Sequence, residues 1–258
     1  TSSYTGTVAL SGSNTYSGSL TISNGTLSIA TVDAIGGSGA VTNNAAFVLN
    51  ISSIETLSRV ISGTGSLTHS GSGTTTLSVA NTYTGATQVT AGVLKVSNAS
   101  GLGATSSGTT VNGGTLELLV DVGSEPLTLS SGTLKTTSGN YTSGGAISLS
   151  GDMVIDIGGN LTLSGNITGV GPSQSIIKRG IGTLILGGST SQFSGGITIS
   201  AGTLQAGVDS SVSYSPFDKD QSPFDQPFVL RTERMDADLA LLRSRACHAA
   251  LRTSGSAR

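Results

Sequence analysis

The sequence predicts an all-β protein, a right-handed parallel β-helix (β-solenoid), over residues 1–207 of 258. Three observations predict this class: short segments in which apolar and hydroxyl residues alternate, turns rich in glycine and asparagine, and a motif that recurs along the chain. Aromatic residues, which fit poorly inside a narrow coil, make up only 4% of the chain. Residues 208–258 differ in composition, and we expect a linker followed by a helical or disordered tail.

The strand pattern is clearest in four tetrapeptides with period two, in which one face is apolar and the other carries hydroxyls. They begin at Leu20, Leu127, Leu161 and Ile197. Pairs such as Asn24-Gly25 and Gly144-Gly145 lie between the strands and tolerate the positive φ that tight corners need. We therefore expect short strands turned at glycine and asparagine.

Internal repetition is the strongest signal in the sequence. Residues 6–27 align with residues 73–94 without a gap, and residues 182–204 align with both after one insertion. A shorter Gly-Thr-Leu unit recurs between these copies, as at Gly114 and again at Gly132. Spacings of roughly 20 residues suit one turn of a solenoid, so residues 1–207 predict roughly ten turns and a rod on the order of 50 Å long.

Composition limits the function classes. Charged residues make up 10% of the chain, against about 25% in a typical soluble domain, and the net charge of −2 gives no electrostatic case for binding nucleic acid. The 36% apolar content, spread as short runs, argues against disorder, and the single cysteine rules out an intrachain disulfide framework. No apolar run is long enough for a membrane-spanning helix, and Thr1–Tyr4 lack the basic and apolar segments of a signal peptide.

The three copies, at residues 6–29, 73–96 and 182–206, resemble the passenger-associated transport repeat of bacterial autotransporters. The resemblance implies a passenger exported through the outer membrane by a C-terminal β-barrel, with repeats that help it fold and leave the cell. No barrel strands are present, so we expect the chain to be a piece of such a protein or a relative secreted otherwise. Host-cell or neighbouring-cell surface ligands are the partners this implies, with no small-molecule substrate evident.

A carbohydrate-active β-helix enzyme is the alternative, so we considered the carboxylates that are spaced to face one side of a strand. These are Asp152 with Asp156, and Glu117 with Asp121; isolated solvated carboxylates are the simpler interpretation of both pairs. Lys178-Arg179 is interpreted as a surface charge in a loop. The sequence therefore predicts no catalytic, cofactor-binding or metal-binding residue and no enzymatic activity.

The two histidine-containing segments of the sequence predict no site either. His69 lies beside Ser70 and Ser72, but adjacent strand residues face opposite sides, so a hydrolase pair is not expected. Cys247 and His248 lack the further ligands of a zinc site.

The tail after residue 207 contains 7 of the 12 basic residues and 7 of the 14 acidic residues. Residues 235–251 have an apolar face at helical spacing, with acidic residues near the start and arginines toward the end. A disordered, cloning-derived or frame-shifted end is the simpler interpretation, and a partner-binding helix is the alternative.

Overall fold

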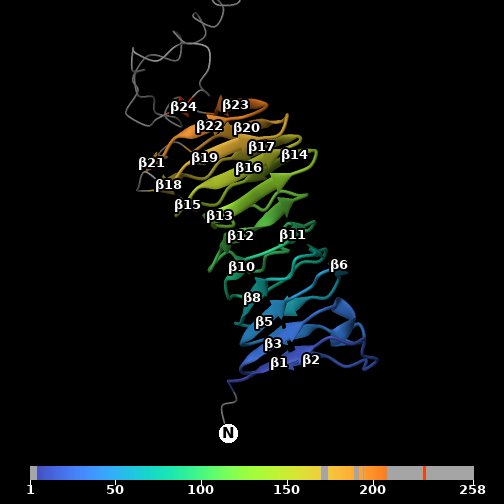
Figure 1. The fold of residues 1–258 in the computed structure, drawn as a ribbon. Helices are drawn as coiled ribbons and strands as arrows, with labels where there is room; N and C mark the ends of the chain where they lie inside the picture. The colour runs from blue at the N-terminus through green and yellow to red at the C-terminus, as the bar shows by residue number, and fades with distance from the viewer. Residues whose placement is uncertain (1–4, 170–173, 189–191, 194, 208–228, 231–258) are drawn as a thin grey trace, which may run out of the picture.

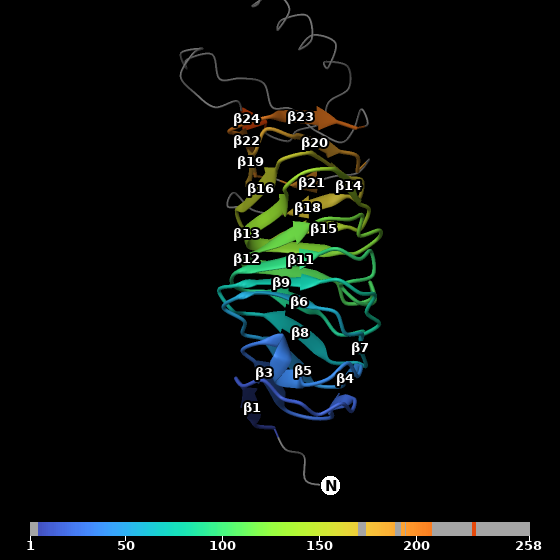
Figure 2. The same cartoon turned by 90° about the vertical axis from the view of Figure 1, so that its right-hand side faces the viewer.

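The computed structural model describes residues 5–169, 174–188, 192–193, 195–207 and 229–230. These residues form an elongated stack in which the chain winds upward from the N-terminus, turn upon turn (Figures 1 and 2). Each turn contributes up to three short strands, and the strands of successive turns pair in parallel. The predicted all-β parallel solenoid is confirmed.

The turns build three faces. The strands of face 1 are β1 (Thr7–Leu10), β3 (Thr26–Ile29), β5 (Ala46–Leu49), β8 (Ser66–His69), β10 (Thr87–Val89), the first halves of β12 (Thr109–Leu118) and β13 (Leu127–Thr136), β15 (Ile147–Leu149), β18 (Ile167–Gly169) and β21 (Gln192–Phe193). Those of face 2 are β6 (Ile54–Leu57), β9 (Thr74–Leu77), β11 (Val93–Val96), the second halves of β12 and β13, β16 (Met153–Ile157), β19 (Ile176–Arg179) and β22 (Ile197–Ile199). Those of face 3 are β2 (Leu20–Ile22), β4 (Val41–Asn43), β7 (Ile61–Ser62), β14 (Asn140–Ser143), β17 (Asn160–Leu163), β20 (Thr183–Leu186) and β23 (Thr203–Ala206).

Strand register gives the length of each turn. On face 1, one of the shortest steps pairs Thr109 with Leu127, and the widest described step pairs Thr168 with Gln192. The other steps on this face fall between these two. Ten strand positions follow one another here, so the prediction of roughly ten turns of about 20 residues is confirmed.

The interior is a continuous column of aliphatic side chains, because every second residue of each strand points inward. One inward ladder on face 1 passes through Ile29, Leu49, His69, Val89 and Val111 in adjacent turns. All five are fully buried, as are most inward positions of the other two faces. The stacked column therefore supplies the apolar burial that a polar, glycine-rich chain needs in order to fold.

The three copies of the repeat begin on three different faces. The first copy starts at β1 on face 1, the second at β9 on face 2 and the third at β20 on face 3. In each copy the last strand stacks on the first: β3 on β1, β11 on β9 and β23 on β20. One copy thus closes a full turn, and the shift from the first copy to the second corresponds to three turns and one further face.

Two short elements depart from the stack. On face 2 of the second turn, the 3₁₀ helix η1 (Val32–Ile35) takes the place of a strand. At the other end, β24 (Val229–Leu230) pairs with β22 in antiparallel orientation. The rest of residues 208–258, including the helix predicted at 235–251, lies outside the described residues, and the division at residue 207 stays a prediction. No helix in the described part of the chain is long and apolar enough to cross a membrane.

Candidate functional site

The Asp152 and Asp156 carboxylates lie on the outer side of face 2, but they do not converge. Four residues along a strand separate the two by about 13 Å, whereas a shared Ca²⁺ needs oxygens at about 2.3–2.6 Å. Asp152 Oδ1 accepts hydrogen bonds from the Ser175 hydroxyl (2.7 Å) and N–H (2.9 Å), which lower the pKa of Asp152. Asp156 instead stands in register with Arg179. The two carboxylates are therefore separate groups on the outer surface of the solenoid and do not form a site for one cation.

Glu117 and Asp121 are likewise separated. The interpretation as an isolated, solvated carboxylate is wrong for Glu117, which is buried on β12, pairs with Lys95 (3.1 Å) and accepts a hydrogen bond from the Thr137 hydroxyl. Burial opposes these contacts, but together they lower the pKa of Glu117. Asp121 lies beyond the strand end, where its Oδ1 accepts the N–H of Thr142 (2.7 Å). Each carboxylate is thus engaged in holding neighbouring turns together.

His69 is an interior residue. Its Nδ1 lies 2.9 Å from the carbonyl oxygen of Ala91 and therefore carries the proton, and its Nε2 then accepts from Thr75 Oγ1 at 3.2 Å. Burial lowers the pKa of His69, although the Ala91 hydrogen bond opposes this effect. Both ring nitrogens are therefore used within the core, and neither is directed at Ser70.

The interpretation of Lys178-Arg179 as loop surface charges is wrong for Lys178. Both residues belong to β19, and the Lys178 side chain points into the column with no exposed surface. Its Nζ donates to three carbonyl oxygens, those of Arg179 (3.0 Å), Gly180 (2.9 Å) and Ala201 (3.1 Å). These bonds use all three ammonium donors, so the backbone of a corner satisfies the charge. Burial lowers the pKa of Lys178, and the negative charge of the nearby Asp156 opposes this effect.

A buried polar cluster lies at the centre of the rod, and it was not predicted from the sequence. The Tyr83 hydroxyl lies 2.6 Å from Thr87 Oγ1, and Thr109 Oγ1 donates to Glu125 Oε1 at 2.8 Å. Thr87 and Thr109 are neighbours in the ladder, at inward positions that Leu67 and other apolar residues fill elsewhere. Burial raises the pKa of Glu125 to about 7, with the Thr109 bond opposing it. The signal in the sequence was a threonine at the same inward position of two successive turns.

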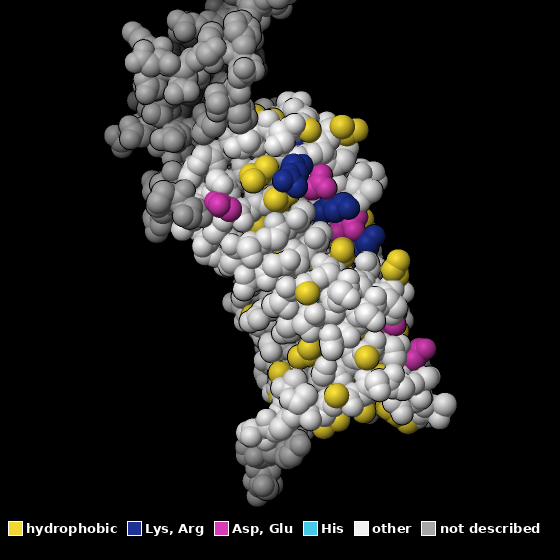
Figure 3. All heavy atoms as spheres, in the orientation of Figure 1, with side chains coloured by type: hydrophobic (Ala, Val, Ile, Leu, Met, Phe, Trp, Pro, Cys, Tyr) yellow, Lys and Arg dark blue, Asp and Glu magenta, His cyan; other side chains and the backbone are white. Residues whose placement is uncertain are grey.

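Charged side chains on face 2 form a ladder of alternating sign. Five consecutive turns place these residues in register: Lys95, Glu117, Lys135, Asp156 and Arg179. Figure 3 shows the alternation as a band of dark blue and magenta, with further magenta side chains lying apart from it. We call this set the charge ladder. Opposite charges directly across neighbouring strands attract, and a shift of one residue would remove every pairing, so the ladder favours the observed register of the five turns.

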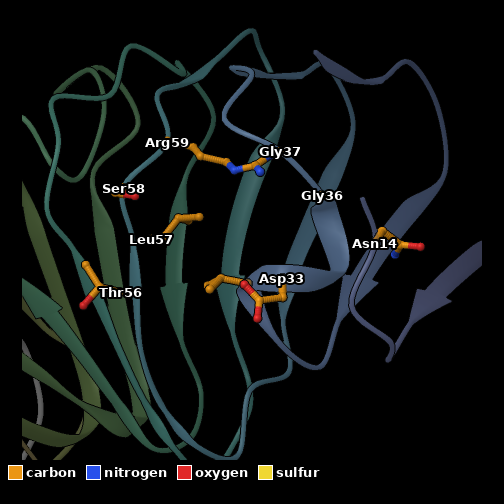
Figure 4. Close-up of a pocket in the computed structure, with 9 residues that line it drawn as sticks. Asn14, Asp33, Gly36, Gly37, Thr56, Leu57, Ser58 and Arg59 are labelled. Atoms are coloured by element: carbon orange, nitrogen blue, oxygen red, sulfur yellow. The ribbon is translucent and has the colours of Figure 1, made fainter. Parts of the chain in front are cut away.

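A polar cleft lies on face 2 of the first three turns, where η1 replaces a strand (Figure 4). It has a volume of about 360 Å³, and its lining residues are Asn14, Val32, Asp33, Gly36, Gly37, Thr56, Leu57, Ser58 and Arg59. The Arg59 guanidinium reaches across it and donates from Nη1 to the carbonyl oxygens of Ile35 (2.9 Å) and Gly39 (3.5 Å). We call this the Arg59 cleft. None of its side chains was predicted from the sequence to belong to a site.

The described residues contain no group of three or more His, Cys, Asp or Glu side chains that could hold a metal ion. Cys247 and His248 lie outside the described residues.

Comparison with known proteins agrees with the repeat pattern. The model of the passenger-associated transport repeat family matches residues 2–29, 67–96, 100–118 and 176–206. Three of these stretches cover the copies identified in the sequence, and the fourth contains the unit at Gly114. The chain is also 45% identical, over 101 residues, to the adhesin BmaC autotransporter of Brucella suis biovar 1 (strain 1330).

The similarity to that adhesin covers 39% of this chain and 3% of the adhesin. The chain therefore matches a very small part of that relative's length. No solved structure is detectably similar to the chain.

Proposed function

We propose that this chain, which carries passenger-associated transport repeats in a parallel β-solenoid, is part of an autotransporter-type passenger of the bacterial cell surface and acts there as a structural stalk. The observation that carries the proposal is the stacking of ten turns on one buried aliphatic column. Such a column makes a rod, of about 50 Å at roughly 4.8 Å per turn, and leaves the outer surface free to vary.

Stacking also suits export. Each turn leaves unpaired strand edges that match the next turn, so a turn that folds outside the cell offers a template for the one that follows. Glycines at the corners keep successive turns close: a side chain at Gly165 would overlap the carbonyl group of Gly145 in the turn before it. We propose that the repeats support secretion in this way, and that an outer-membrane β-barrel of the whole protein is the partner.

The name of the Brucella relative is that of an adhesin, and we propose that this solenoid serves adhesion by holding a binding surface away from the membrane. Catalysis is not part of the proposal, because the carboxylates considered for it do not converge on a common point. Polygalacturonate cleavage, tested with and without Ca²⁺, checks this. Turnover that is lost in Asp152→Asn or Asp156→Asn would contradict a non-enzymatic role.

Surface display tests the stalk proposal directly. The chain is fused between a signal peptide and an autotransporter barrel, and a tag at its N-terminus is scored on intact cells by antibody binding and protease access. We expect display of a protease-resistant rod. Leu116→Asp, which places a charge in the aliphatic column, is the control and should reduce display. Equal display of both forms, or a compact shape of the purified chain in solution scattering, would contradict the proposal.

A further inference from the structure

The Arg59 cleft exists because face 2 is incomplete at the second turn. The strand β6 pairs in parallel with β9 on one side, while η1 and not a strand lies on the other. The Thr74 N–H donates to the carbonyl oxygen of Ser53, and the Ser78 N–H donates to that of Leu57. The backbone N–H and C=O groups of the odd-numbered residues in this segment therefore point toward β9. In a parallel strand alternate residues bond to opposite sides, so the N–H and C=O of Thr56 face the cleft.

The wall opposite β6 is held firmly in place. Glu55 accepts hydrogen bonds from the Val32 N–H (2.5 Å) and the Thr31 hydroxyl (3.3 Å), which tie η1 to β6. Although partial burial of Glu55 opposes them, these bonds and one from Ser53 lower its pKa, so the carboxylate stays ionised. The cleft is therefore built into the fold and does not depend on a loop closing over it.

Arg59 has donors left for a ligand. Nη1 is engaged with the carbonyl oxygens of Ile35 and Gly39, whereas Nε and Nη2 make no hydrogen bond to the described residues. Those two atoms form the side of a guanidinium that binds a carboxylate through two parallel hydrogen bonds. Because Nη1 is anchored, the guanidinium is already oriented and loses little freedom on binding. Arg59 is also the only lysine or arginine in the sequence before Lys95.

The rest of the cleft suits hydroxyl groups. Asp33, Thr56 and Ser58 are exposed and line the cleft, where they supply a carboxylate and two hydroxyls, and Gly36 and Gly37 add backbone without side chains. Tyr16, 39% exposed, lies against Gly36, one of the residues that line the cleft. A volume of about 360 Å³ falls within the range of small-molecule sites, about 300–1,000 Å³.

We propose that the Arg59 cleft is a binding site for an acidic saccharide, whose carboxylate pairs with Arg59 while its hydroxyls bond to Asp33, to Ser58 and to the edge of β6 at Thr56. Sialic acids and uronic acids share this chemistry. The site is independent of the stalk role, since it concerns one outer surface of three turns.

Binding to the purified chain by isothermal titration and saturation-transfer NMR tests the site. The probes are 3′-sialyllactose and trigalacturonate, each with a neutral counterpart, lactose and maltotriose. We expect one acidic probe to bind at least tenfold more tightly than its neutral counterpart, and which one binds tells the two sources apart. Arg59→Ala should weaken that binding roughly tenfold to a hundredfold. Arg59→Lys should restore part of it, because lysine keeps the charge and loses the bidentate geometry.

Two further variants keep the test decisive. Arg179→Ala removes an exposed arginine at the far end of the charge ladder, with the same change in net charge, and should leave binding unchanged. Thr56→Tyr keeps Arg59 and fills the cleft, so it tests the site even where Arg59→Ala disturbs the corner at Ile35 and Gly39. Failure of both acidic probes to bind, equal loss in Arg179→Ala, or full binding in Thr56→Tyr would overturn the proposal without affecting the stalk.

Discussion

Tyr16 and Tyr83 occupy the same position in the first two copies of the repeat, yet Tyr16 is 39% exposed and Tyr83 is fully buried. Both lie against a glycine of the next turn, Gly36 and Gly103, which occupy matching positions and both have a positive φ. Tyr83 also has the previous turn on its other side, where the carbonyl oxygen of Ile61 accepts a hydrogen bond from the Thr82 N–H (2.9 Å). No described turn lies there for Tyr16.

The preceding asparagines show the same contrast. The side-chain amides of Asn14 and Asn81 each donate to a carbonyl of the next turn at 2.6 Å, those of Ala34 and Gly101. Asn81 Oδ1 also accepts the N–H of Ile61 from the previous turn, at 2.8 Å. The repeat thus sets the same local geometry twice, whereas burial depends on having a neighbour on both sides. One copy is an incomplete unit of stability.

The largest effect that sharpens this contrast is expected from truncating the two tyrosines. Tyr83→Ala leaves a cavity in the column and should lower the free energy of unfolding by about 3–5 kcal/mol. Tyr16→Ala should cost less than about 1 kcal/mol, because the side chain is partly in water. Urea unfolding followed by circular dichroism measures both, and similar losses would show that the two copies are buried alike.

The next effect concerns the glycine that faces Tyr83. A Cβ at Gly103 would lie 2.6 Å from the Tyr83 carbonyl oxygen and 3.0 Å from its ring, at a φ of +83°. Gly103→Ala should therefore cost about 2–4 kcal/mol in the same unfolding measurement. Gly123→Ala is the matched control, since its φ is also positive but no atom lies within 4 Å, and it should cost only about 1–2 kcal/mol. Equal costs would mean that packing against Tyr83 is loose.

Glu125, in the same buried polar cluster as Tyr83, should make the stability of the chain depend on pH. The pKa of Glu125 rises from 4.5 to about 7 in the folded chain, so the unfolded chain loses this proton first as the pH rises. Stability should fall by about 3 kcal/mol between pH 4.5 and 7 on this account. Glu125→Gln should remove the fall, seen as a flatter stability profile and a more stable chain at pH 8. His69, with its lowered pKa, acts in the opposite sense below pH 6.5, so the readout is the difference between variant and wild type.

Replacing the two asparagines should give a smaller difference in stability between the two copies. Asn81→Ala leaves the buried Ile61 N–H and the Gly101 carbonyl without their partner, at a cost of about 2 kcal/mol. Asn14→Ala, at an exposed position, should cost under about 1 kcal/mol. Hydrogen exchange at the Ile61 amide gives a local readout, and unchanged protection there in Asn81→Ala would contradict the assignment.

The smallest effect is expected on the outer surface, where the charge ladder serves the later turns. Lys135→Glu puts three acidic side chains in a row with Glu117 and Asp156 and should cost about 1 kcal/mol at low salt. Lys135→Gln should cost less, and adding about 1 M NaCl should reduce the difference between the two. A difference that does not change with salt would mean that packing and not charge is responsible.

Much of the fold was predictable because it depends on local periodicity. Alternation such as Leu127-Thr-Leu-Ser, glycine corners and the spacing of Gly114 and Gly132 indicated the strands, the turns and the length of a turn. The prediction for Lys178 was wrong because a charged residue within an apolar pattern is usually a sign of an exposed loop. Its burial depends on three carbonyl oxygens, one of which comes from the following turn.

The sequence by itself determined that the chain is a stack of short strands, because period-two alternation and the positive φ of corner residues are properties of neighbouring residues. Only the tertiary structure decided which residues from different turns meet. Tyr83 and Glu125, the five residues of the charge ladder and the two walls of the Arg59 cleft all come from separate turns, far apart along the chain. Turn lengths, from the short step between Thr109 and Leu127 to the long one between Thr168 and Gln192, decide those meetings, because each insertion changes which sequence positions pair in the turns that follow.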